Sequence, residues 1–229
     1  MARVVIGIVG YFQFIRGYPL GPELMQRLLA VPWPDGTEIC EMNWGPIAIV
    51  QDFQAKAEKY DRVVLVGAVD RGLTTGVVTS RRWVGGVLET LEVQRRVFEA
   101  VTGVISLDNL LIIGAHFDVW PEEVITVEAQ FSEDSLSDLV LAEIEIDREA
   151  GEMAVIGTRP LTEDNNKIVD RIVELTRTAA LDGVSGVAQI QPLTADQLTA
   201  VSPFSHHQFM DDHQAAWQTN GREQSKWTH

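Results

Sequence analysis

The sequence has little of what secreted, nucleic-acid-binding and membrane proteins need. Cys40 is its only cysteine among 229 residues, so no intrachain disulfide can form and nothing points to an oxidising compartment. Lysine and arginine total 18 against 33 aspartate and glutamate, which gives a formal net charge of −15. A surface of that charge repels a phosphate backbone, so nucleic acid is not an expected partner.

Long apolar runs are also missing. The opening MARVVIGIVG is interrupted at Gly10, and Gln13 and Arg16 follow, well short of the roughly 20 apolar residues that span a bilayer. We therefore expect no membrane insertion, no secretion signal and a cytoplasmic location. Hydrophobic residues make up 45% and charged residues 22% of the chain, which is typical of a packed globular protein.

The first third of the chain alternates strand and helix patterns. The β-branched run 3–9, RVVIGIV, predicts a strand that is buried on both faces. Helical spacing at 21–29, a strand at 37–42, a helix at about 47–59 and an apolar strand at 62–68 follow. This order predicts a three-layer, doubly wound α/β fold of the phosphorylase/hydrolase-like kind, with a mainly parallel sheet of about five strands.

The second half continues with less regular patterns. A short strand is expected at 77–83 and a buried strand at 109–115, NLLIIGA, which would end just before His116. Between them, helical spacing at 89–101 places Leu91, Val93, Val97, Phe98 and Val101 on the side expected to face inward.

The remainder predicts an inserted hairpin, a helix and a tail. Two strand-like runs flank a Gly-containing turn, which predicts an inserted β-hairpin at about 139–158. A last long helix is expected at 166–181. We therefore expect one α/β domain over 1–183 and a C-terminal extension over 184–229, mobile or ordered by a partner.

Ligands of doubly wound sheets bind at the carboxyl ends of the strands. The sequence is expected to present Asp70, His116 and Asp118 there, which could act as a catalytic base, its orienting acid and a second carboxylate. A plainer interpretation is that His116 is solvated and that Asp118 caps a turn before Trp120. Both interpretations stay open.

The same strand ends carry residues suited to binding. Arg16 and Arg71 could bind a carboxylate, such as the C-terminus of a protein, or could pair with Asp70 or a neighbouring glutamate. Asn43 and Trp44 follow the second strand and would add polar and aromatic contacts. No dinucleotide or phosphate-loop motif accompanies them.

Four stretches resemble the hydrogenase maturation protease family, nickel-recognising endopeptidases that trim the C-terminus of a hydrogenase large subunit. They are VVIGIVG with the later GPELMQRLL, YDRVVLVGAVDRGLTTGVV, LLIIGAHFDVWPEEV and GTRPLTEDNNKIVDRIVELTRTAAL. Together they span residues 4–181. The resemblance implies the same α/β fold and a metal site built from an acidic residue, an aspartate and a histidine.

All three implied metal ligands are missing from this sequence. The first loop offers Tyr18 and its neighbours without a carboxylate, the third strand has Gly67 where the family has aspartate, and the next helix begins at Thr90 without histidine. Glycine and threonine cannot supply the imidazole and ionised carboxylates that a nickel or zinc site needs. We therefore expect no metal at the family site and no cofactor, although His206, His207 and His213 in the extension could bind a transition metal.

Two functions follow from these observations. The first is a divergent family member that has lost metal-dependent proteolysis and binds another protein as an assembly or maturation factor. The second is an active peptidase or other hydrolase with a relocated site at Asp70, His116 and Asp118, which requires these side chains to converge.

Overall fold

The computed structural model describes residues 2–10, 20–101, 106–131, 161–188 and 190–198. The expected hairpin at 139–158 therefore lies outside the described residues, as do Arg16, Tyr18, His206, His207 and His213. Within the described part of the chain, no helix is long and apolar enough to cross a membrane.

In the described residues, six strands form one mixed sheet in the order β2-β1-β3-β5-β4-β6. Its central part is parallel and consists of β2 (Thr37–Met42), β1 (Val4–Val9), β3 (Arg62–Val69) and β5 (Glu123–Gln130). The remaining strands, β4 (Val78–Gly85) and β6 (Gln191–Thr194), are parallel to each other, and β4 is antiparallel to β5. The expected α/β class with a mainly parallel sheet is confirmed.

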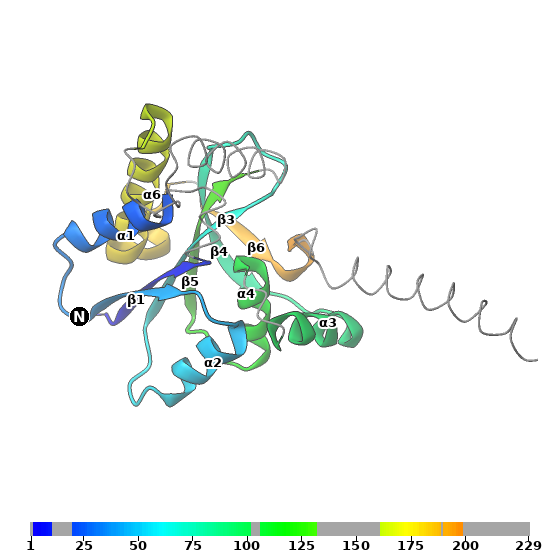
Figure 1. Cartoon of the computed structure of the whole chain (residues 1–229). Coiled ribbons are helices and arrows are strands. Elements are labelled where there is room, and N and C mark those ends of the chain that lie inside the picture. The colour runs from blue at the N-terminus through cyan, green and yellow to red at the C-terminus, as the bar shows by residue number, and fades with distance from the viewer. Residues whose placement is uncertain (1, 11–19, 102–105, 132–160, 189, 199–229) are drawn as a thin grey trace, which may run out of the picture.

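Helices cover both faces of this sheet (Figure 1). On one face lie α1 (Leu20–Ala30) and α6 (Glu163–Asp182), and on the other lie α2 (Pro46–Ala55), α3 (Thr90–Val101) and α4 (Leu107–His116). The 3-10 turns η2 (Gly183–Ser185) and η3 (Ala195–Gln197) follow α6 and β6.

Strand β1 shows how the sequence builds the two cores. Its residues Val4, Ile6 and Ile8 pack in the core that includes α1 and α6, whereas Val5 and Val9 pack in the core that includes α2 and α4. Side chains of a strand alternate between the two faces of the sheet. A continuous apolar run is therefore what a strand between two helical layers requires.

The segment predicted as a strand at 109–115 is a helix, and that prediction was wrong. Ser106 caps α4, because its Oγ accepts a hydrogen bond from the Asn109 backbone N–H at 3.1 Å. The strand instead is β5, EVITVEAQ, which begins after the turn at Trp120. Periodicity does not separate a short buried helix from a buried strand when every position is apolar, and α4 is buried from Leu107 to Gly114.

Helix α3 is also oriented differently from the prediction. Leu91, Phe98 and Val101 are 58%, 47% and 71% exposed, whereas Arg96 is only 2% exposed. Arg96 Nε donates to Glu92 Oε1 at 2.9 Å. The Arg96–Glu92 pair therefore lies on the side of α3 that packs inward, whereas Leu91, Phe98 and Val101 lie on the exposed side.

The sheet extends into the segment expected as a tail. β6 pairs with β4, Leu193 is fully buried, and Ala195 and Leu198 belong to the core. The expected break at residue 183 therefore does not coincide with the last residue of the sheet, because residues up to Leu198 pack on it.

Candidate functional site

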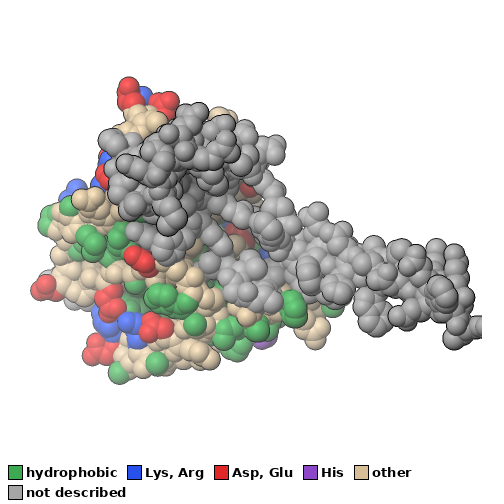
Figure 2. All heavy atoms as spheres, in the orientation of Figure 1, with side chains coloured by type: hydrophobic (Ala, Val, Ile, Leu, Met, Phe, Trp, Pro, Cys, Tyr) green, Lys and Arg blue, Asp and Glu red, His purple; other side chains and the backbone are tan. Residues whose placement is uncertain are grey.

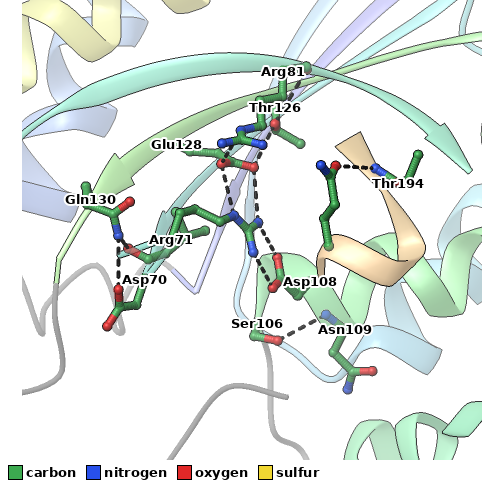
Figure 3. A network of polar contacts seen from close by, with 12 residues as sticks. Asp70, Arg71, Arg81, Ser106, Asp108, Asn109, Thr126, Glu128, Gln130 and Thr194 are labelled. Carbon is green, nitrogen blue, oxygen red and sulfur yellow. Dashed lines mark hydrogen bonds and ion pairs between the residues drawn. The ribbon is translucent and has the colours of Figure 1, made fainter. Parts of the chain in front are cut away.

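Polar side chains gather where the carboxyl ends of β3 and β5 meet the start of α4 (Figure 3). Arg71 follows β3, Glu128 lies near the end of β5, and Asp108 is in the first turn of α4. In a doubly wound sheet this edge is where ligands bind. These three residues therefore define the candidate site, and we refer to them as the Arg71 network.

Arg71 is held by both carboxylates of the network. Its Nη1 and Nη2 donate to Asp108 Oδ2 and Oδ1, each at 2.6 Å. Its Nε and Nη2 also donate to Glu128 Oε2 and Oε1, each at 3.2 Å. The planar guanidinium thus binds two carboxylates bidentately, which is the arrangement that its fixed fork of N–H donors favours.

All three side chains are withdrawn from solvent. The side chain of Arg71 is 6% exposed, that of Asp108 is 1% and that of Glu128 is 0%. Arg81 on β4 places its Nε 3.5 Å from Glu128 Oε2, and Thr126 Oγ1 donates to Glu128 Oε1 at 3.0 Å. Two arginines therefore balance two buried carboxylates, as buried charges require.

Burial and pairing act on the protonation of these groups in opposite directions. Burial raises the pKa of Asp108, and its hydrogen bonds with Arg71 oppose that rise. Burial lowers the pKa of Arg71, but its hydrogen bonds and charge interactions with Asp108 and Glu128 outweigh this effect and raise its pKa above the ordinary value. Arg71 is therefore a charged guanidinium in this network.

Asp70 is next to the network but is not part of it. Its Oδ1 accepts hydrogen bonds from the Gly72 backbone N–H at 2.9 Å and from Gln130 Nε2 at 3.5 Å. Gly72 has φ +68°, so the turn after β3 uses a conformation that favours glycine. Among the alternatives for Arg71, the pairing with a glutamate agrees with the structure and the pairing with Asp70 does not.

His116 and Asp118 lie at the opposite edge of the sheet. They follow α4, whose C-terminal end leads through Trp120 into the start of β5, and Asp118 lines a small pocket with Lys59 and Tyr60, which precede β3. Asp70 follows β3, a strand of 8 residues, which at about 3.3 Å per residue spans roughly 26 Å. The prediction that the three side chains share one edge depended on the wrong strand at 109–115. The structure does not bring them together.

The local geometry of Asp118 agrees with the plainer interpretation. Its φ is +51°, the one positive value among the described non-glycine residues, and its N–H donates to the Ala115 carbonyl at 3.2 Å. A left-handed residue directly after a helix is a common way to end it. The relocated hydrolase site therefore lacks the convergence on which it depends.

The comparisons with known proteins can now be set beside this geometry. No protein-family model and no curated protein matches the chain. Among solved structures, a hydrogenase 3 maturation protease matches 83% of this chain and 96% of its own, with TM-score 0.43 and 13% identity. The hydrogenase 2 maturation peptidase from Thaumarchaeota archaeon SCGC_AB-539-E09 matches 66% of this chain and 99% of its own, with TM-score 0.29 and 16% identity. The chain resembles hydrogenase maturation proteases.

The positions that the sequence resemblance implies for metal ligands have other uses here. Gly67 lies on β3 against α4, and a Cβ added to it would be 3.2 Å from Leu107 Cβ. Thr90 is the exposed first residue of α3. Gly67 therefore serves the close packing of a helix on a strand, and Tyr18 lies outside the described residues.

The remaining binding candidates follow β2. Asn43 Nδ2 donates to Glu41 Oε2 at 2.9 Å, and Trp44 is 49% exposed. Both are at the same edge as the Arg71 network, because β2 is parallel to β1 and β3. Only Trp44 among these two offers a large side chain to a ligand.

The residues of the Arg71 network do not fit a nickel or zinc ion. In the described ranges, no group of three or more His, Cys, Asp or Glu side chains is arranged to hold a metal. The carboxylates of Asp108 and Glu128 already bind Arg71, whose positive charge repels a divalent cation. The segments that join β1 to α1 and α3 to α4, residues 11–19 and 102–105, contain no aspartate, glutamate, histidine or cysteine.

Sequence reasoning found Arg71 but missed both of its main partners. Glu128 interrupts the apolar interior of β5, EVITVEAQ, and Asp108 lies two residues after the serine that caps α4. A charged residue in a strand that is buried on both faces is a signal of a paired charge. The signal was lost because the neighbouring helix was predicted as the strand.

Proposed function

We propose that this protein is a hydrogenase maturation protease-like protein that has lost metal-dependent proteolysis and works by binding another protein, as an assembly or maturation factor. The observation that supports this most is the Arg71 network. An arginine stands among the carboxylates at the edge of the sheet where a doubly wound fold binds its ligands.

The network opposes metal binding through its stability as well as its charge. A metal that used Asp108 and Glu128 would first have to displace Arg71 and leave a buried guanidinium without its partners. Breaking a buried ion pair costs about 3–5 kcal/mol. By the rule that 1.4 kcal/mol is a factor of ten, the metal affinity would fall by roughly a hundred- to a few thousand-fold.

Protein binding is supported by what remains exposed at the same edge. After β2, Trp44 is 49% exposed. Between β3 and β4, Leu73 is 43% exposed and Val77 is 40% exposed. Exposed aromatic and aliphatic side chains are typical anchors of protein interfaces. Arg71 is fully engaged, so these apolar side chains would make the contacts to a partner or to a protein C-terminus.

The test uses a hydrogenase large-subunit precursor with its C-terminal extension, because that is the substrate class of the family the chain resembles. The precursor is mixed with the full-length protein in the presence and absence of nickel. Binding is measured by biolayer interferometry, and cleavage is followed by intact mass.

We expect a complex without a change in precursor mass, and Trp44→Glu should weaken that complex. Leu29→Glu, on α1 at the other face of the sheet and 63% exposed, is the matched control. Nickel-dependent removal of the extension would refute the loss of proteolysis. Absence of any complex would refute binding of this class of partner.

A further inference from the structure

Helix α3 presents apolar side chains to solvent on one side. Phe98 and Val101 follow Leu91 by seven and ten positions, which places the three residues on the same side of a helix. They are 58%, 47% and 71% exposed, and Val87, three residues before α3, is 97% exposed. We call these four residues the α3 surface. Hydrophobic side chains are visible over this end of the molecule in Figure 2.

Contacts on the opposite side of α3 hold the helix in its orientation. They prevent a rotation that would turn the four side chains of the α3 surface inward. Arg96 is 2% exposed and is bonded to Glu92, and its charge acts on Asp108 of the Arg71 network. Ala100 and Val97 pack with Ile113 of α4. Burying Leu91 by rotation would carry Arg96 out of this setting, so the exposure of the α3 surface is a stable feature of the fold.

The charges around the α3 surface are mainly negative. Glu89 is exposed just before α3, and Asp196 is exposed on η3. η3 adjoins this end of the surface, since a Cβ on Gly86 would be 2.9 Å from Ala195 Cβ. Among the described residues of α3, Arg95 is the one cation on the exposed side, and its Nη1 is 3.7 Å from Glu92 Oε2. The chain as a whole carries a net charge of −15.

We propose that the α3 surface docks an amphipathic helix of a partner protein, whose apolar face is flanked by lysine or arginine. Apolar contacts would supply affinity, and the acidic rim and net charge would attract a basic partner. A second copy of this chain is disfavoured because it brings the same net charge and the same rim. The inference rests on the proposed protein-binding function and names a second surface for it.

The experiment measures binding of a dye-labelled synthetic amphipathic helix of leucine and lysine to the full-length protein by fluorescence anisotropy. The variant Leu91→Glu with Val101→Glu should weaken binding about tenfold or more, as loss of interface anchors does. Leu29→Glu on α1 is 63% exposed and is the matched control that should leave binding unchanged. The α3 variant adds negative charge, so a loss of affinity for a basic helix reports lost apolar contact.

A second arm tests the charge. Glu89→Lys with Asp196→Lys should weaken binding and should reduce its dependence on salt concentration. Circular dichroism confirms that each variant is folded. Equal weakening by Leu29→Glu, or no effect of the α3 variant, would overturn the proposal.

Two results would identify a different occupant of the α3 surface, and each would also overturn the proposal. A concentration-dependent dimer that Leu91→Glu with Val101→Glu abolishes, measured by light scattering, would identify a second copy. Peptide binding that strengthens when residues 199–229 are deleted would identify that segment of the chain. If Trp44→Glu abolishes precursor binding but the labelled helix does not bind the α3 surface, docking at the α3 surface is refuted and the proposed function still stands.

Discussion

Replacing Arg71 by methionine tests the energetic role of the network most sharply. The change removes the guanidinium and keeps most of the side-chain volume, while Asp108 and Glu128 remain 1% and 0% exposed. Removing one partner of a buried ion pair costs about 3–5 kcal/mol, because the other charge is left uncompensated. Since Arg71 serves two carboxylates, we expect the upper part of that range at pH 7.

The effect of Arg71→Met should depend on pH with a definite sign. Burial already raises the pKa of Asp108, and without Arg71 this rise is opposed less, so the folded-state pKa of Asp108 lies further above its unfolded value of about 4. A raised acid pKa means that stability is lost as the pH rises through the interval between those values. The destabilisation should therefore be smallest below about pH 4 and should grow toward neutrality.

The assay is urea unfolding followed by tryptophan fluorescence at several pH values, with a surface pair as control. Arg171 Nη1 is 2.6 Å from Glu174 Oε2 on α6, with side chains 50% and 65% exposed, so Arg171→Met should cost no more than about 0.5 kcal/mol. The double variant Arg71→Met with Asp108→Asn should recover much of the loss, because Asp108 is then no longer an unpaired buried charge and Glu128 keeps its ion pair with Arg81. If Arg71→Met costs no more than Arg171→Met, the reasoning is refuted.

Three further predictions concern single residues elsewhere in the fold. Burial raises the pKa of Cys40 to about 11, so iodoacetamide should alkylate it much more slowly in the native protein at pH 8 than in urea; equal rates, followed by mass spectrometry, would contradict this. Asp118→Gly should stabilise the protein by about 0.5–1 kcal/mol, because φ +51° suits glycine; a loss of stability in thermal melts would count against it. Hydrogen bonds from Tyr60 and then from Lys56 lower the pKa of Glu38, so the stability that Glu38 contributes is present above its unfolded pKa and is lost as the pH falls through its folded pKa. Glu38→Gln should therefore destabilise by less than about 1 kcal/mol at pH 7 in the same urea titrations, and by less as the pH falls below the unfolded pKa of Glu38.

The sequence predicted the architecture well where local patterns were distinct. The strands at β1, β2 and β3 and the helices α1, α2 and α6 were expected within a few residues, because β-branched runs, Pro at a helix start and Gly at turns mark them. The pattern at 109–115 was ambiguous, because α4 is buried on all sides and its run Leu110–Ile113 is apolar at every position.

The candidate site was harder to predict because its partners come from three separate elements. Arg71 was named from its position after β3, but its pairing with Asp108 and Glu128 depends on α4 beginning at the carboxyl edge of the sheet. No local spacing encodes that contact. The grouping of Asp70 with His116 and Asp118 failed for the same reason, since one wrong element reversed the edge at which they lie.

The most direct test of the central claim is a nickel titration of the full-length protein by equilibrium dialysis, with His206, His207, His213 and His229 replaced by alanine to remove the extension's imidazoles. We predict no stoichiometric nickel, because Arg71 holds the two carboxylates that could bind it. Arg71→Ala serves as the comparison, since any gain of affinity there reports carboxylates released from the guanidinium. One nickel per chain in the parent protein, lost in Asp108→Asn or Glu128→Gln, would contradict the account.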